Sequence, residues 1–136
     1  MFTRFRVTTG SNVELQDITS QVREGVQNSG VKEGVCHVLV PHTTAGVIIN
    51  EAADPDVGRD ILAQLENIVP SHGNYQHREG NAPAHIKASL VGCSQTLLVE
   101  DGRLVLGTWQ GVFFCEFDGP RQRTVLIQVL PSGDQQ

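Results

Sequence analysis

Residues 35–49 read VCHVLVPHTTAGVII, two runs rich in β-branched side chains separated by Pro41-His42-Thr43-Thr44. Both runs, Val35 to Val40 and Ala45 to Ile49, are too continuously apolar for strands that expose one face to water. We therefore predict two central strands of a sheet, joined by a short polar connection. His37 falls inside the first run, and we expect it to be a core residue whose hydrogen bonds are satisfied.

Three other segments carry apolar side chains at helical spacing, each between a capping residue and a residue that stops a helix. Their caps and stops are Asp17 or Thr19 with Gly30, Asp54-Pro55 with Pro70, and Asn81 with Gly92. Their apolar stripes are Ile18, Val22 and Val26; Val57, Ile61, Leu65 and Ile68; and Ile86 and Leu90. We expect three helices, each with one apolar face.

Further strands are expected on both sides of these segments. They are residues 2–9, 97–100, 104–106, 112–117 and 123–130. Phe5 and Val7 alternate with arginines, as in a half-buried strand, and Asp101-Gly102 favours the tight turn of a hairpin. The mixture of strands and about three helices predicts a compact single domain over residues 1–136, α+β in class with mixed or antiparallel sheets, in which residues 131–136 form a frayed tail.

The composition argues against several classes of function. The chain is 39% hydrophobic but has no apolar run near the roughly 20 residues of a membrane-spanning helix, and its first residues lack the apolar stretch of a signal peptide. We expect a cytoplasmic protein.

A formal net charge of −5 argues against a nucleic-acid surface, which needs clustered lysines and arginines, so the expected partner is a small molecule. The three cysteines, Cys36, Cys93 and Cys115, lie among apolar neighbours and are predicted to be buried, reduced thiols.

We expect the chemistry near residues 70–80, because long irregular segments inside a domain are commonly functional or mobile. His77 lies in this segment, His42 follows a predicted strand and His85 lies on the next predicted helix. Three neutral imidazoles with an open fourth position suit a catalytic zinc ion, so we hypothesise that these three histidines are metal ligands. The alternative is that each imidazole hydrogen-bonds backbone groups at the end of a strand or helix. His72 is interpreted as a loop residue only.

Several short motifs follow one another along the chain. They are His42-Thr43-Thr44-Ala45, Asn50-Glu51, Asp54-Pro55-Asp56, Tyr75-x-His77, Asn81, Ala84-His85, Ser94 through Gly102, Leu104-x-Leu106-Gly107-Thr108-Trp109-Gln110, and Glu116-x-Asp118-Gly119-Pro120-Arg121-x-Arg123. In order and spacing they resemble the YjbQ-like family, often described as secondary thiamine-phosphate synthases, and the resemblance runs from about Arg4 to Leu130. Pro83 departs from the family pattern, in which this position is usually small or polar.

The resemblance implies a homotrimer with a polar cleft, and an enzyme that joins a pyrimidine diphosphate to a thiazole phosphate and expels diphosphate. Glu51 is the preferred general base, because Asp54 and Asp56 are already explained by a helix start, and His42 is also expected to be catalytic. The substrate and its phosphate are expected to contact Thr43, Asn81, Lys87, Trp109, Gln110, Arg121 and Arg123. For Lys87, Arg121 and Arg123 the alternative is a solvated surface position, and for Trp109 it is core packing.

The expected cofactor is a divalent metal, zinc rather than magnesium, because the predicted ligands are imidazoles. Diphosphate chemistry more often uses magnesium on carboxylates, so two other functions stay open. One is metal-assisted hydrolysis, in which a metal-bound water attacks an ester or amide. The other is a non-catalytic module that binds a small ligand or a metal.

Overall fold

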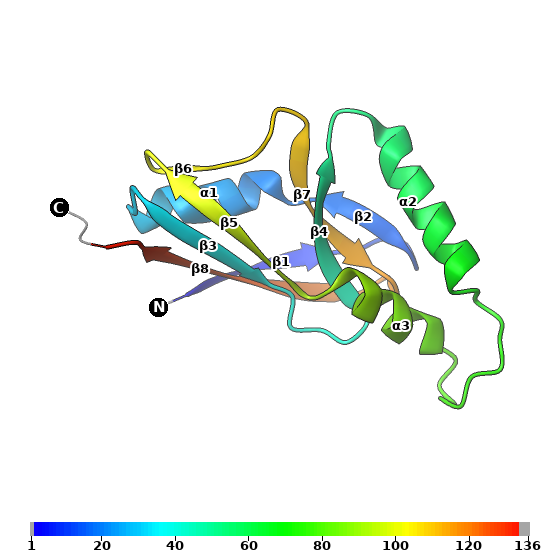
Figure 1. Ribbon diagram of the computed structural model, residues 1–136. Coiled ribbons are helices and arrows are strands. Elements are labelled where there is room, and N and C mark those ends of the chain that lie inside the picture. The colour runs from blue at the N-terminus through cyan, green and yellow to red at the C-terminus, as the bar shows by residue number, and fades with distance from the viewer. Residues whose placement is uncertain (1, 134–136) are drawn as a thin grey trace.

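Strands from distant parts of the chain pair in two antiparallel sheets (Figure 1). The computed structural model describes residues 2–133. Its elements are β1 Thr3–Thr8, β2 Glu14–Asp17, α1 Thr19–Ser29, β3 Gly34–Leu39, β4 Ala45–Glu51, α2 Pro55–Ile68, α3 Ala82–Val91, β5 Ser94–Glu100, β6 Arg103–Leu104, β7 Gln110–Glu116 and β8 Gln122–Pro131. One sheet has the order β1-β8-β3-β5-β6 and the other β2-β7-β4. These helices and antiparallel sheets confirm the predicted α+β domain.

The two strands predicted within residues 35–49 lie in different sheets. β3 lies in the middle of the five-stranded sheet, between β8 and β5, so its prediction as a central strand is confirmed. The same prediction is wrong for β4, which is an edge strand and pairs only with β7. β4 is apolar from Ala45 to Ile49 because both its faces are covered there: Val47 belongs to the main core, and Ile48 packs against a second cluster beneath the helices.

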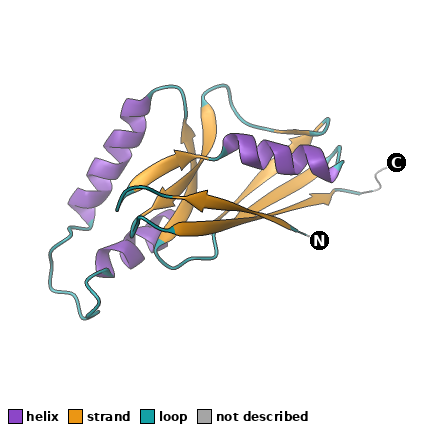
Figure 2. Ribbon diagram, turned by 180° about the vertical axis from the view of Figure 1, so that it is seen from behind, coloured by secondary structure: helices purple, strands orange, loops and turns teal. Residues whose placement is uncertain are grey.

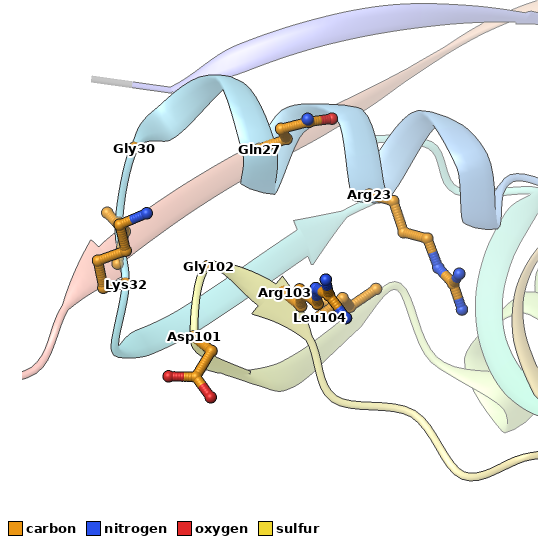
Figure 3. Close-up of a pocket in the computed structure, with 9 residues that line it drawn as sticks. Arg23, Gln27, Gly30, Lys32, Asp101, Gly102, Arg103 and Leu104 are labelled. Atoms are coloured by element: carbon orange, nitrogen blue, oxygen red, sulfur yellow. The ribbon is translucent and has the colours of Figure 1, made fainter.

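A tight hairpin joins β5 and β6, as Asp101-Gly102 predicts. Both turn residues have positive φ angles, 53° and 74°, the conformation that a primed two-residue turn requires. The second strand of the hairpin ends at Leu104, earlier than predicted, although the N–H of Val105 still bonds to the carbonyl of Leu98 at 2.9 Å. Figure 3 shows this hairpin lying opposite the last turns of α1.

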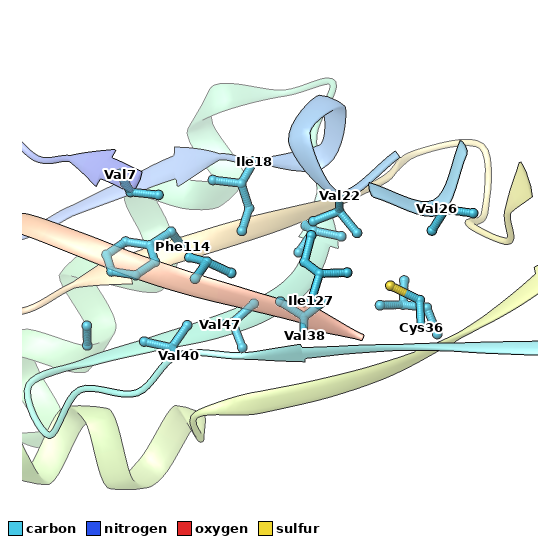
Figure 4. Packing of buried hydrophobic residues seen from close by; sticks show 14 of the residues in the cluster. Val7, Ile18, Val22, Val26, Cys36, Val38, Val40, Val47, Phe114 and Ile127 are labelled. Atoms are coloured by element: carbon cyan, nitrogen blue, oxygen red, sulfur yellow. The ribbon is translucent and has the colours of Figure 1, made fainter. Parts of the chain in front are cut away.

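The main hydrophobic core joins both sheets to α1, which crosses the strands on one side of the molecule (Figures 2 and 4). Ile18, Val22 and Val26 are fully buried, as their spacing predicts. Each such side chain contributes about 1.5–3 kcal/mol on burial, which explains how an 11-residue helix of otherwise marginal stability is held in place. Gly30 ends α1 in the left-handed conformation, with a φ of 72°. Strand β2 was not predicted, since Leu15 is its only apolar residue.

A second cluster covers the outer face of the three-stranded sheet. Ala84 and Ala88 of α3 pack there against Cys115 and Phe117. The predicted apolar stripe of this helix is wrong: Ile86 and Leu90 are exposed, and small residues form the buried face instead. Small residues allow close approach, so a Cβ atom added at Gly46 of β4 would lie only 2.5 Å from Val91.

Helix α2 lies beside this cluster and begins as the sequence predicts. The carboxylate of Asp54 accepts the N–H of Asp56 at 2.9 Å, and Pro55 occupies the first turn. Leu62 and Leu65 pack partly against the second cluster, although no residue of α2 is fully buried. The helix ends at Ile68, before Pro70.

Two smaller predictions are corrected. Cys93 is exposed, whereas Cys36 and Cys115 are buried as expected. His37 is not a core residue, because it points to the open face of the five-stranded sheet, where its Nδ1 lies 3.0 Å from the hydroxyl of Thr96.

The prediction of a frayed tail is wrong for Pro131 and Ser132. β8 extends to Pro131, and the N–H of Ser132 bonds to the carbonyl of Glu33 at 2.9 Å. Residues 134–136 of that prediction lie outside the described residues. Among residues 2–133, no helix combines the length and apolarity needed to cross a bilayer.

Candidate functional site

Two adjoining cavities, of about 140 Å³ and about 410 Å³, lie at the N-terminal end of α3. Ser71, Gly80 and Pro83 line both cavities, which we therefore treat together as the α3 cleft. Its polar lining residues are Asn12, Glu66, Ser71, His72, Tyr75, His77, Asn81, Lys87 and Asp118. Pro83 is buried in the first turn of α3, a position where proline is well tolerated. The α3 cleft thus gathers the loop of residues 70–80 and part of the predicted site.

Lys87 is the most deeply buried cation of the α3 cleft, with 3% of its surface exposed. Its Nζ donates to Glu66 of α2 at 2.6 Å, and the other oxygen of that carboxylate accepts the N–H and the hydroxyl of Ser71. The bond from Lys87, followed by those from Ser71, lowers the pKa of Glu66 to about 2. The interpretation of Lys87 as a solvated surface residue is therefore wrong.

Asn81 precedes α3, and we predicted that its side chain caps this helix. This prediction is wrong, because the side chain makes no capping hydrogen bond. Its amide nitrogen instead donates to the Asp118 carboxylate at 2.9 Å, and Arg121 donates to the same oxygen at 2.8 Å. The amide oxygen of Asn81 is buried and has no hydrogen-bond partner among residues 2–133. A buried acceptor without a partner costs about 1–3 kcal/mol, so this oxygen favours a ligand that donates an N–H or O–H.

The structure brings together two of the three predicted metal ligands. The rings of His77 and His85 meet edge to face, with their centroids 5.1 Å apart. His42 is engaged elsewhere, because its Nε2 accepts the backbone N–H of Thr124 at 2.9 Å. Within residues 2–133 no three His, Cys, Asp or Glu side chains are placed to hold a metal ion. Two imidazoles fit zinc in donor chemistry, but one chain alone does not assemble the predicted triad.

His42 lies beside a buried ion pair that the sequence analysis did not assign. Arg123 bonds to both carboxylate oxygens of Glu116 and donates to the hydroxyl of Thr44 at 2.9 Å. Burial, reinforced by the charge of Arg123, lowers the pKa of His42 below its ordinary value. Arg123, expected to contact phosphate, is thus an interior side chain with 5% of its surface exposed.

The Glu116 carboxylate accepts further bonds from the polypeptide. Thr9 donates its hydroxyl at 2.7 Å and Asp118 its N–H at 3.0 Å. Burial alone raises the pKa of Glu116, but the bonds from Arg123, Asp118 and Thr9 outweigh it and hold that pKa below its ordinary value. Since Asp118 also bonds to Asn81, the buried ion pair is directly connected to the α3 cleft.

The other predicted site residues lie outside the α3 cleft. Glu51 lines a separate cavity of about 390 Å³ between α2 and the three-stranded sheet, and its carboxylate accepts the N–H of Ala53 at 3.1 Å. Trp109 is 64% exposed in the loop before β7, so core packing is excluded for this chain. Gln110 accepts a backbone N–H of the same loop at 2.8 Å. Thr43 is exposed on the connection between β3 and β4.

Sequence reasoning missed Glu66, Glu116 and Asp118 as functional candidates. The signal for the last two was present, since both belong to the quoted motif that ends in Arg123. An acidic residue at the end of a strongly apolar strand needs a buried cation, and the nearest downstream arginines were the obvious candidates. Glu66 gave no comparable signal, because an acid on an amphipathic helix is usually solvated.

Fold and site together define an α+β domain with a polar cleft at the start of its third helix. Comparison with known sequences gives the family. The profile described as UPF0047 protein YjbQ-like matches residues 3–132. A UPF0047 protein of Methanocaldococcus jannaschii is 48% identical over 96% of this chain and 94% of its own length, and YugU of Bacillus subtilis is 47% identical over 96% and 99%. The chain belongs to the YjbQ-like (UPF0047) family.

Solved structures agree. A YjbQ/UPF0047 protein of Clostridium acetobutylicum has a TM-score of 0.93 and 51% identity, covering 94% of this chain and 99% of its own. A protein of Sulfolobus solfataricus, described as YbjQ-like and of unknown function, has a TM-score of 0.93 and 36% identity over 97% of both chains. These similarities confirm the fold, and the descriptions of these four relatives give no activity.

Proposed function

We propose that this protein is an enzyme that binds phosphorylated heterocycles in the α3 cleft and has secondary thiamine-phosphate synthase activity. The observation that carries the proposal is the unpartnered buried oxygen of Asn81, which lines the same cavity as Lys87, while Arg121 bonds to the Asp118 carboxylate that Asn81 also contacts. An amide oxygen accepts the N–H of an aminopyrimidine, and the cations suit phosphate oxygens. One cleft thereby offers partners to both ends of such a substrate.

The proposed reaction is a substitution at the methylene carbon of the pyrimidine diphosphate. The bond from that carbon to the diphosphate oxygen breaks, and diphosphate departs with the electron pair. The thiazole nitrogen supplies the pair for the new carbon–nitrogen bond. Lys87 and Arg121 would stabilise the charge that grows on the departing diphosphate, which is the usual role of fixed cations in phosphate chemistry. No proton transfer is needed for this step, so Glu51 would act only if the true substrate requires a base.

We propose further that a divalent metal, zinc rather than magnesium, binds to His77 and His85. The part of the chain that the structure describes places no third ligand beside them, so the proposal takes it from a neighbouring subunit of a homotrimer, with His42 as the candidate. His42 would have to release the N–H of Thr124 to offer its Nε2 to a metal. When bound, zinc would supply electrophilic stabilisation of an anionic oxygen.

Self-association is supported by the open face of the five-stranded sheet. Three leucines on this face, Leu39, Leu98 and Leu130, are 39%, 62% and 41% exposed. Strand register places Val35 directly between Leu98 and Leu130, so these three side chains form an apolar row across β5, β3 and β8, and Leu39 lies four residues further along β3, beyond His37. Such a row on an uncovered sheet face favours a protein contact. The free cysteines agree with the proposed cytoplasmic location.

The direct test is a coupling assay with untagged protein, a pyrimidine diphosphate and a thiazole phosphate, with and without zinc. We expect diphosphate release that depends on both substrates and is lost in Asn81→Ala and Lys87→Met, with Arg6→Gln, on the exposed side of β1, as the control. Turnover of an ester or amide panel without coupling would favour the metal-assisted hydrolase. Saturable binding without any turnover would favour the non-catalytic module.

Mixed trimers test the site between subunits. His42→Ala and His85→Ala chains are each expected to lose stoichiometric zinc. If His42 completes the site of its neighbour, refolding the two variants together restores some intact sites, because a site then needs His42 from one chain and His85 from another. Unchanged zinc content in the separate variants, or no recovery on mixing, would reject the shared site without affecting the coupling assay.

A further inference from the structure

A second cleft lies at the other end of the molecule, between the last turns of α1 and the β5–β6 hairpin (Figure 3). Its volume is about 570 Å³, within the range of small-molecule sites. We call it the α1 cleft, and its charged or hydrogen-bonding lining residues are Arg23, Gln27, Lys32, Asp101, Gly102 and Arg103. In Figures 1 and 2 the hairpin and the loop that joins α2 to α3 lie at opposite ends of the domain. The α1 cleft shares no lining residue with the α3 cleft.

The α1 cleft is positively charged in a protein whose formal net charge is −5. Arg23, Lys32 and Arg103 line it, against a single acid, Asp101. Among residues 2–133, none of these three cations has an acidic side chain within ion-pair distance, whereas the cations at the buried ion pair and in the α3 cleft are paired. Figure 3 shows the Asp101 carboxylate pointing away from α1.

Backbone bonds fix the walls of the cleft. The N–H of Gly102 donates to the carbonyl of Lys32 at 3.0 Å, and the N–H of Asp101 donates to the Glu33 carboxylate at 3.1 Å. The Nζ of Lys32 lies 3.7 Å from the point where a Cβ atom of Gly102 would stand, so this ammonium covers the turn. These contacts hold the hairpin against the segment that follows α1.

The third wall comes from the helix. Arg23 and Gln27 are one turn apart in α1 and share a face. Figure 3 shows Arg23 on the side of the cleft opposite Lys32, with Arg103 between them. Two guanidinium groups, an ammonium and an amide thus surround one hollow, and guanidinium groups match phosphoryl oxygens with paired hydrogen bonds.

We propose that the α1 cleft is a second ligand site, which binds a small molecule carrying phosphoryl groups. Arg23 and Arg103 bind the phosphoryl oxygens, Lys32 adds charge, and Gln27 contacts the rest of the ligand. The site does not depend on the chemistry proposed for the α3 cleft. A ligand there would act at a distance from the reaction centre.

The test is a nuclear magnetic resonance titration of ¹⁵N-labelled protein with inorganic diphosphate at low ionic strength. We expect saturable shifts of the Lys32, Gly102 and Arg103 amides. The Arg23→Gln/Arg103→Gln double variant should bind at least about tenfold more weakly there, because two charge-assisted hydrogen-bond donors are lost. The matched control is Arg4→Gln/Arg6→Gln, which removes the same charge from β1 and should bind diphosphate at the α1 cleft like the wild type.

Three results would overturn the proposal. They are the absence of saturable shifts at these amides, equal weakening in both double variants, and citrate binding as tightly as diphosphate, which would show that phosphoryl groups are not preferred. Shifts of Asn81 and Lys87 report the α3 cleft separately. These shifts should persist in the Arg23→Gln/Arg103→Gln variant, so the experiment tests the two proposed sites independently.

Discussion

Arg123 and Glu116 form an ion pair inside the domain, with the arginine Nε 2.9 Å from one carboxylate oxygen and a second nitrogen bonded to the other. Glu116 is completely buried, and only 5% of the surface of Arg123 is exposed. The pair ties β7 to β8, which belong to different sheets. Because β7 and β8 flank Asp118, the pair also positions the turn that carries the hydrogen bond to Asn81.

Arg123→Met should lower the free energy of unfolding by about 3–5 kcal/mol, since it leaves the Glu116 carboxylate buried without its partner. The Arg123→Met/Glu116→Gln double variant should recover part of this loss, because no buried charge remains. Urea denaturation measures both. The control, Arg121→Met, removes an exposed pair with Asp118, for which about 0–1 kcal/mol is expected. A double variant less stable than Arg123→Met would contradict this account.

The same variant should change how stability depends on pH. In the wild type the pKa of Glu116 is lowered, so the unfolded chain binds more protons than the folded one. The stability from this group is then present above the unfolded pKa and lost as the pH falls through the folded pKa. In Arg123→Met burial remains and raises the pKa, so this contribution changes sign. Denaturation midpoints between pH 7 and pH 4 should fall less steeply in Arg123→Met than in wild type.

The fold could be predicted largely because its apolar patterns are local. The Ile18, Val22 and Val26 stripe and the Asp101-Gly102 turn each specify their own structure within a few residues. The placement of β4 could not be predicted in this way. The continuous run of apolar residues in β4 reflects burial on both faces. An edge strand covered by α3 has the same sequence pattern as a central strand.

The candidate site was harder to predict because its bonds join residues far apart in the sequence. Asn81 precedes a helix, and its position favours a cap, but the side chain bonds to Asp118 instead. Lys87 lies between the exposed Ile86 and the buried Ala88 on a short helix, and the sequence does not show that α2 supplies Glu66 as its partner. Family resemblance identified several of these residues, whereas only the folded chain shows which of them meet.

Lys87→Met should raise the pKa of Glu66 from about 2 towards the ordinary value of 4.5. The largest cause of the lowered pKa is the bond from Lys87, and the weaker contribution from Ser71 remains, so the rise should be incomplete. Carboxyl ¹³C shifts followed from pH 7 to pH 2 measure it directly. Ser71→Ala, which removes only the hydroxyl bond, should cause a smaller rise. A larger effect from Ser71→Ala would show that the buried ammonium is not the main cause.

Native protein should react with one equivalent of a thiol reagent per chain, and unfolded protein with three. Cys93 is exposed, while burial raises the pKa of Cys36 to about 11 and that of Cys115 to about 12. Both buried thiols are therefore protonated and shielded near neutral pH. Spectrophotometric titration with and without denaturant gives the counts. In a Cys93→Ser variant the native count should fall to zero, and a remaining fast equivalent would place a second thiol at the surface.

His42 should be a neutral imidazole with its proton on Nδ1, because Nε2 accepts the N–H of Thr124. Two-bond ¹H–¹⁵N spectra distinguish this tautomer.

The pKa of His42 is lowered by burial and by the charge of Arg123. As the pH falls below the ordinary value of about 6.5, the unfolded chain therefore takes up a proton before the folded one. Stability should therefore decrease as the pH falls from 7 to 5, and this decrease should be smaller in His42→Gln. His37→Gln, which removes an exposed imidazole, is the control and should behave like the wild type. Equal pH dependence in wild type and His42→Gln would show that His42 does not titrate as described, and a proton on Nε2 would contradict the hydrogen bond from Thr124.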